Sequence, residues 1–206
     1  MYLRKFALLM SVCALLPFAT SACAQQFDIA VGGSTLFSTK NSTASRAFVP
    51  PPEKGGVYPN FSIDRIYKNR LGYSAELAFR YKQGIYNGYQ PYRPLLYDFN
   101  AVYAPRLKGV FPSRLDKRIS VLLLGGAGGQ SVIFYNQFGN CVYSACNTHL
   151  NSNHFLVHAG FGIRYRVWRN FFARPEANYY RIFNNDFHSD NVVRLGASVG
   201  YTFHTD

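Results

Sequence analysis

Outside its first residues, the 206-residue sequence lacks the long apolar run that a membrane-spanning helix requires. Such a helix needs about 20 consecutive apolar residues. The longest later run, Ile119 to Gly129, is interrupted by four glycines. Acidic residues are also few, 10 against 22 Lys and Arg, and the mean hydropathy is only −0.10. The missing apolar run and the low mean hydropathy exclude a helical membrane protein and leave a membrane-spanning β-barrel or a soluble globular domain.

Cysteine is equally scarce. Two of the four cysteines fall within the first 24 residues, and the other two are Cys141 and Cys146. A pair this close in a polar stretch is typical of a local disulfide formed in an oxidising compartment. The spacing to His149 and His154 matches no zinc pattern. We therefore expect a Cys141–Cys146 disulfide, no metal and no cofactor.

The N-terminus has the features of a secretory signal peptide. Arg4 and Lys5 precede an apolar segment, Phe6 to Pro17, and Ala22-Cys23-Ala24 offers the small residues that signal peptidase needs. We expect residues 1–24 to be a cleaved signal peptide and residues 25–206 to form one domain. Two alternatives are a short transmembrane anchor, for which the apolar segment is too short, and a lipoprotein acylated at Cys23, which would lack the usual preceding leucine.

Abundant aromatic residues and strict alternation dominate the remaining chain. Aromatics make up 17% of the sequence, with 16 Tyr and 18 Phe. In Leu71–Lys82, apolar or aromatic residues alternate with small or charged ones, which is the period of a β-strand. Stretches of about 10–13 residues match tilted membrane strands better than soluble strands. Eight such stretches can be counted: 27–37, 57–66, 71–82, 95–104, 117–130, 154–166, 171–183 and 191–203.

The connections between these stretches alternate in length. Ser38–Gly56 and Ser131–Asn153 are long, whereas Tyr67–Arg70 and Val167–Asn170 are short. Long outer loops and short periplasmic turns are typical of bacterial barrels, although Pro105–Asp116 is longer than such a turn. The pattern predicts an all-β fold: a single antiparallel up-and-down eight-stranded transmembrane β-barrel in the cell outer membrane.

The C-terminal part carries a family resemblance. A glycine-rich strand (Gly160–Tyr165), a short turn (Trp168–Asn170), a strand with an inward glutamate (Phe171–Tyr179) and a final strand (Val193–Phe203) follow one another. This order resembles the OmpA/OmpX-like eight-stranded outer-membrane β-barrel family, and the resemblance implies the same fold. One departure is that His204-Thr205-Asp206 follow the terminal aromatic residue, which the barrel assembly machinery usually recognises in this family.

The faces opposite the aromatic residues carry charges of both signs. In so narrow a barrel the lumen is filled by side chains, and buried charges must be paired. We expect an interior ion-pair network centred on Glu76 and Glu176 with Arg80, Arg164 and Arg194. The full set of expected lumen residues is Glu76, Arg80, Asp98, His158, Arg164, Arg174, Glu176 and Arg194.

Three functions remain open at this point. The first is a structural or surface-interaction role through the long loops, with outer-membrane lipids and an extracellular ligand as partners. The second is a narrow porin-like channel gated by the lumen charges. The third is a lipid A-modifying enzyme such as a deacylase, suggested by Phe187-His188-Ser189-Asp190, although adjacent His and Ser residues on a strand point to opposite faces. We expect no enzymatic activity.

The net charge of +12 does not indicate nucleic-acid binding in an exported chain. Many basic residues fall in the connections assigned to the periplasmic side, including Lys68, Arg70 and Arg169. They could meet anionic phospholipid headgroups of the inner leaflet or be solvated turn residues.

Overall fold

The computed structural model describes residues 24–38, 53–86, 88–105, 118–142, 145–187 and 189–203, with the side chains of 24–25 and 136–149 left out. The described part is built from β-strands. They are β1 (Ala24–Ser38), β2 (Tyr58–Tyr67), β3 (Leu71–Phe79), β4 (Gly84–Tyr86), β5 (Gln90–Tyr103), β6 (Ile119–Val142), β7 (Ala145–Trp168), β8 (Phe171–Ile182) and β9 (Asn191–Phe203).

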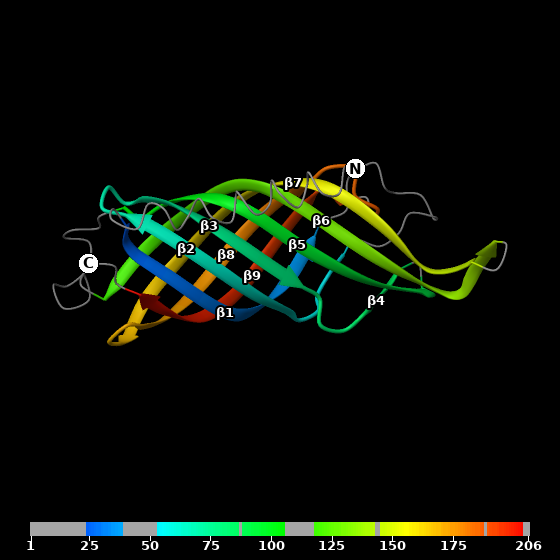
Figure 1. Ribbon diagram of the computed structural model, residues 1–206, viewed down its shortest axis with the longest axis horizontal. Coiled ribbons are helices and arrows are strands. Elements are labelled where there is room, and N and C mark those ends of the chain that lie inside the picture. Colours follow the sequence, from blue (N-terminus) through cyan, green and yellow to red (C-terminus); the bar gives the residue numbers. More distant parts are fainter. Residues whose placement is uncertain are drawn as a thin grey trace.

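Eight long strands close into an antiparallel barrel (Figure 1). Long strands that follow one another along the chain pair with each other, including β3 with β5 across the short β4. β1 pairs with β9 from Phe27 opposite Phe203 to Ser38 opposite Val192. β4 is a three-residue strand that pairs only with the start of β5 among the described strands. The predicted all-β, up-and-down, eight-stranded barrel is therefore confirmed. Its closure leaves no long strand without two neighbours along the barrel wall.

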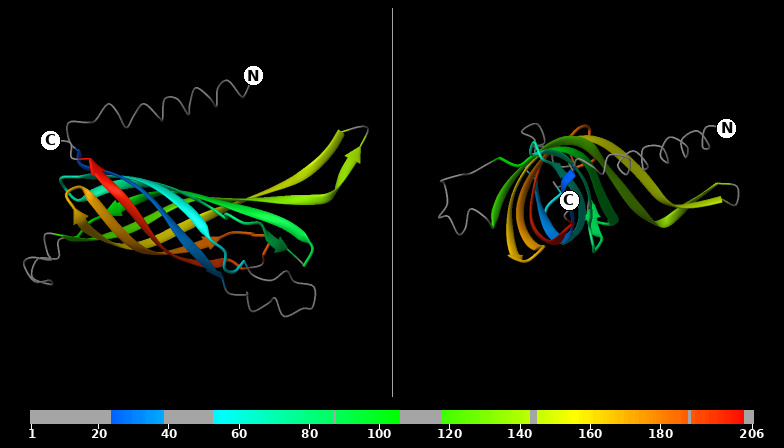
Figure 2. Two further views of the ribbon diagram at one scale, coloured as in Figure 1. Left: turned by 90° about the horizontal axis from the view of Figure 1, so that it is seen from below. Right: turned by 60° about the vertical axis from the view of Figure 1, so that its left-hand side comes forward.

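The connection expected at Ser131–Asn153 differs from the prediction. β6 continues to Val142 and β7 begins at Ala145, so most of this stretch is a two-stranded ribbon rather than a loop. The ribbon extends well beyond the barrel rim (Figure 2). The residues there do not alternate because a ribbon outside the membrane has water on both faces, and neither face has to be apolar.

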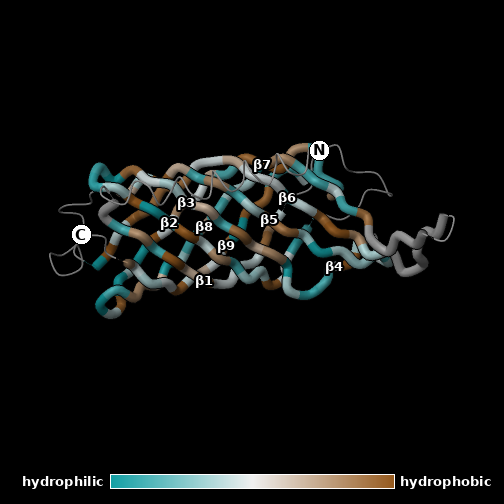
Figure 3. Tube along the Cα trace, in the orientation of Figure 1, coloured by the Kyte–Doolittle hydropathy of each residue, from teal (hydrophilic) through white to brown (hydrophobic). Residues whose placement is uncertain are grey.

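The two faces of the wall have opposite chemistry. Outward residues are large, apolar and exposed, such as Phe99 and Val199, which are 70% and 62% exposed. Inward residues are polar and buried, such as Asp28 and Arg194, both 0% exposed. The alternation of apolar and polar residues is visible along the strands (Figure 3). A soluble barrel would have the reverse arrangement, so this wall is suited to a lipid surrounding.

The two ends of the barrel also differ. β1 begins and β9 ends beside the two tight turns, in which Arg70 and Arg169 have positive φ angles of 70° and 45° (Figure 2). At this end Trp168 stacks on Phe171 with ring centroids 6.1 Å apart, and Phe171 contacts Tyr201 at 5.1 Å. Aromatic rings at a barrel end match the girdle of a membrane interface. In the described residues, no helix is long and apolar enough to cross a membrane.

Two glycines let β5 and β6 approach closely. A Cβ atom on Gly126 or Gly128 would collide with the backbone of β5, at Phe99 and Tyr97 respectively. Gly125 points the other way, and the nearest atom to its Cβ position, the carbonyl oxygen of His158, is 4.0 Å away. The inward positions of this run, Gly126 and Gly128, therefore have to be glycine, because the neighbouring strand leaves no room for a side chain there.

Candidate functional site in the barrel lumen

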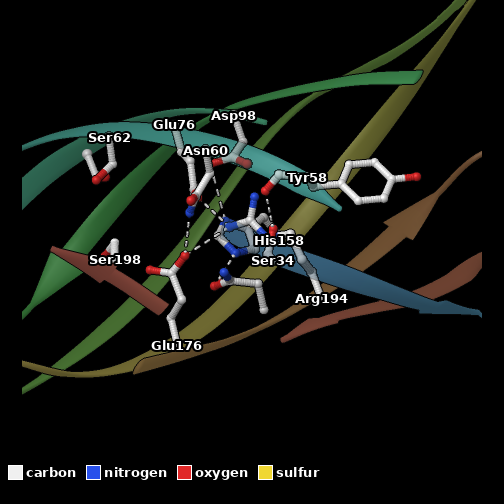
Figure 4. A network of polar contacts seen from close by, with 12 residues as sticks. Ser34, Tyr58, Asn60, Ser62, Glu76, Asp98, His158, Glu176, Arg194 and Ser198 are labelled. Carbon is white, nitrogen blue, oxygen red and sulfur yellow. Dashed lines mark hydrogen bonds and ion pairs between the residues drawn. The ribbon is translucent and has the colours of Figure 1, made fainter. Parts of the chain in front are cut away.

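The middle of the lumen holds two glutamates from different strands. Glu76 on β3 and Glu176 on β8 both accept hydrogen bonds from the amide of Asn60 on β2, at 3.2 and 2.8 Å (Figure 4). Arg194 on β9 pairs with Glu76 and lies 3.5 Å from Glu176. Its guanidinium is also 5.5 Å from the ring centre of Tyr180. Four strands therefore meet at one cluster of buried charges.

A second cluster lies next to this one and shares Glu176. Arg174 Nε is 3.1 Å from Glu176 Oε2, while its other nitrogens donate to Asp64 and, at 2.7 Å, to the hydroxyl of Ser62. The arginine side chain is 3% exposed. Because this guanidinium contacts two carboxylates and a hydroxyl, it joins β8 to β2 across the interior.

Arg164 and His158, both on β7, extend the polar interior in opposite directions. Arg164 pairs with Asp28 at 2.6 Å, close to the end where the tight turns lie. His158 Nδ1 is 2.7 Å from Asn100 Oδ1 and 3.4 Å from Asp98, and its ring stacks on Tyr180 at 4.6 Å. Polar contacts thus line the interior over much of its length.

Arg80 lies apart from the central cluster. Its guanidinium donates to the hydroxyl of Tyr92 at 2.6 Å and covers the ring of that residue at 5.2 Å. The described partners of Arg80 and Arg164 are thus residues other than Glu76 and Glu176. The reason is geometric: Arg80 directly follows β3 and is four residues beyond Glu76, which is about 13 Å along an extended chain.

Several lumen residues escaped the sequence analysis. Asp28, Asp64 and Asn60 lie on β1 and β2, whose alternation is weaker, although their position parity alone would have placed them inward. Glu53 precedes β2 and is 2% exposed; it accepts hydrogen bonds from Tyr58 and, at 2.9 Å, from Gln130. Burial raises the pKa of the Glu53 carboxyl, and the hydroxyl of Tyr58 and the charge of Arg80 only partly offset this rise. No sequence pattern marked Glu53, because it lies in a connection.

Aromatic rings fill the lumen at the end away from the tight turns. Phe187, from the β8–β9 connection, is 2% exposed and packs on Tyr92 at 4.9 Å and on Tyr86 at 5.5 Å. Phe134 of β6 contacts Tyr86 at 5.1 Å. The connection is held in this position because Asn185 accepts hydrogen bonds from the backbone of Phe187 and Ser189.

Two residues of the suspected hydrolase motif, Phe187 and Ser189, help to hold this connection in place. Ser189 is 0% exposed and its backbone is bound by Asn185, while His188 lies outside the described residues. A different Ser–His pair lies nearby: the Ser152 hydroxyl and the Asp186 carboxylate are both 2.9 Å from Nε2 of His154. A catalytic triad needs the nucleophile and the acid on different ring nitrogens, so this contact instead ties the β8–β9 connection to β7.

Several other predictions fall outside the described residues. They are the signal peptide up to residue 23, most of the long connection expected at Ser38–Gly56 (39–52), the connection at 106–117, the tail 204–206 and the side chains of Cys141 and Cys146. The backbone register does place Cys141 opposite Cys146 in the β6–β7 ribbon.

Comparison with known proteins gives structural matches alone: no family model and no curated protein sequence matches the chain. Ail of Yersinia pestis, solved in complex with the heparin analogue sucrose octasulfate, is 15% identical with a TM-score of 0.55, over 86% of this chain and 98% of Ail. The N-terminal β-barrel domain of Pseudomonas aeruginosa OprF is 13% identical with a TM-score of 0.55, over 88% and 99%. Neisserial surface protein A is 11% identical with a TM-score of 0.55, over 86% and 96%.

These likenesses show the fold, which is the eight-stranded barrel that the C-terminal resemblance implied. The apolar outer wall and charged interior described above are the arrangement of a barrel that crosses a bilayer. The protein accordingly has the fold of an outer-membrane β-barrel.

Proposed function

We propose that the protein has a structural or surface-interaction role in the outer membrane, with a lumen closed by side chains. One observation carries the proposal: buried groups occupy the interior from Asp28 and Arg164 at one end to Phe187 at the other. An eight-stranded barrel has an interior just wide enough for side chains. With the short turns toward the periplasm, the aromatic cluster lies at the extracellular mouth.

Planar bilayer recordings test whether the lumen is closed. The purified protein should give no steady conductance, and Glu176→Gln, which keeps hydrogen-bonding groups, should behave in the same way. Glu176→Ala removes the carboxylate between Arg174 and Arg194 and is the variant in which we expect a leak first. Steady channels in the unmodified protein would establish the porin-like alternative in place of this proposal.

The extracellular end is where we place the interaction surface. Ail was solved with the heparin analogue sucrose octasulfate, and this chain has exposed lysines near its extracellular end, so a polyanion is the ligand class that we propose to test first. Lys54 and Lys82 are exposed near that end, whereas Lys68 is exposed in a turn at the opposite end. Binding to immobilised heparin should weaken in a Lys54→Gln/Lys82→Gln variant and stay unchanged in Lys68→Gln. Equal binding by all three proteins would contradict this assignment.

The route to the membrane is part of the same proposal. We infer cleavage after Ala24, so that N-terminal sequencing of the mature protein should begin at Gln25. The register that sets Cys141 opposite Cys146 supports a disulfide across the ribbon. We also propose that the barrel assembly machinery inserts the protein into the outer membrane. No hydrolase activity is proposed, and cells overproducing the protein should keep lipid A of unchanged mass.

A further inference from the structure

The outer wall of the barrel carries a shallow apolar groove. It has a volume of about 370 Å³ and crosses β6, β7, β8 and β9 on the lipid-facing side. Its floor consists of two alanines, Ala159 on β7 and Ala177 on β8. Phe161 and Tyr179 rise beside them, because Phe161 stands opposite Ala177 and Tyr179 stands opposite Ala159 in the register. Each alanine is thus paired with a large aromatic residue on the neighbouring strand, and the two alanines leave a hollow between the two rings.

A cation lies near the extracellular end of this groove. Arg181 has the same outward parity as Ala177 and Tyr179 and is exposed. At about 3.3 Å per residue, four residues separate Arg181 from Ala177 by roughly 13 Å along the strand. Its guanidinium carbon lies 5.7 Å from the centre of the Phe183 ring. A charge on the lipid face is unusual and is tolerated near the interface.

A second polar group stands beside the arginine. Asn191 opens β9 directly opposite Arg181, and its side-chain oxygen accepts a hydrogen bond from Tyr179 at 2.5 Å. That bond leaves the amide N–H₂ of Asn191 as a donor on the same side as the guanidinium. Two donors above an apolar hollow complement a lipid with a phosphate above an acyl chain.

We propose that this surface binds one anionic, phosphate-bearing lipid of the outer leaflet. The acyl chain lies in the groove over Ala159 and Ala177, and the phosphate contacts Arg181 and Asn191. A second copy of the chain fits less well: outward positions on the described parts of β6 to β9 hold no Asp or Glu to pair with Arg181. A two-fold symmetric dimer through this face would therefore bring the Arg181 side chains of both copies toward each other without a carboxylate to neutralise them.

Native mass spectrometry of the full-length protein in detergent tests the site, with phosphatidic acid and phosphatidylcholine as probes. Arg181→Gln should lower the fraction bound to phosphatidic acid several-fold and leave phosphatidylcholine binding unchanged. Ala177→Phe, which fills the hollow, should lower the binding of both lipids. The matched controls are Lys68→Gln, an exposed charge at the other end, and Ala101→Phe, an outward alanine on β5 outside the groove.

All variants are first checked for the gel shift of a folded barrel, so that a loss of lipid binding is not a loss of fold. Unchanged phosphatidic acid binding in Arg181→Gln and Ala177→Phe overturns the proposal. An equal drop in the two controls overturns it as well. If Ala177→Phe instead converts a dimer to a monomer without changing lipid retention, the groove is a contact between copies and the lipid site is wrong.

Discussion

Arg174 shows how a charge is held inside this barrel. Its guanidinium contacts Asp64, Ser62 and Glu176, and the carboxylates are themselves buried. Removing one partner of a buried ion pair leaves the others without a counter-charge, which costs about 3–5 kcal/mol. The stability of the lumen therefore depends on complete groups of residues rather than on single pairs.

We expect Arg174→Met to lower the free energy of unfolding by about 3–5 kcal/mol, because it leaves buried Asp64 without its arginine and Glu176 with Arg194 alone. Urea titration of the folded protein in lipid vesicles measures the change. Lys68→Met, at an exposed turn, should change the free energy of unfolding by less than about 0.5 kcal/mol. Similar values for the two variants would mean that the Arg174 contacts do not stabilise the barrel.

Glu53 should make stability depend on pH. Since burial raises the pKa of its carboxyl in the folded protein above the ordinary 4.5, folding favours the protonated form. Its contribution to stability is fully present below pH 4.5 and is lost as pH rises through the folded-state pKa. Relative to Glu53→Gln, which stays neutral, the wild type should lose stability as pH rises from 4.5 through the folded-state pKa of Glu53. Parallel urea midpoints for both proteins across this range would contradict the expected linkage.

The inward direction of Glu76, Arg174 and Arg194 follows from position parity, which is a local property of a strand. Which residues meet across the lumen is not local, because it depends on the stagger of strands that are distant in sequence. For this reason the sequence did not indicate that Arg164 meets Asp28, or that Arg80 meets Tyr92. Glu53 had no strand parity at all, and its place became visible only with the fold.

At the level of the elements, the sequence predicted strands best where lipid lies on one side and the polar interior on the other. All eight predicted stretches fall on long strands of the barrel, because these two surroundings impose a strict alternation. The outer halves of β6 and β7 were missed because water surrounds both of their faces. The short strand β4 was missed because three residues are too few to show a period.

The close approach of β5 and β6 gives a test at this scale. A side chain at Gly128 would meet the backbone of β5 at Tyr97 and Asp98, so Gly128→Val should destabilise the barrel by about 3 kcal/mol or more. Gly125→Val is the matched control, since its side chain would point outward into open space. The proportion of folded protein on unheated gels measures both. Equal folding of the two variants would show that β5 and β6 can move apart without cost.

For the whole molecule, the main expectation is behaviour as an integral outer-membrane protein. The protein should sediment with the outer-membrane fraction and migrate differently on gels before and after boiling. The physical reason is that a closed barrel keeps its hydrogen bonds in detergent until it is heated. Recovery from the soluble periplasmic fraction would contradict the assignment. Fractionation alongside a known porin and a known periplasmic protein supplies the controls.

The pairing of β1 with β9 also determines the order of events as the chain folds. Residues 27–38 find their partners at 192–203, almost the whole sequence away, whereas most other long strands pair with the next one along. Each hairpin can form early, but the ring cannot close until the last strand has arrived. Until then two open edges are available to other chains. A chain that lacks β9 should therefore lose the entire barrel and aggregate, rather than persist as a seven-stranded remnant.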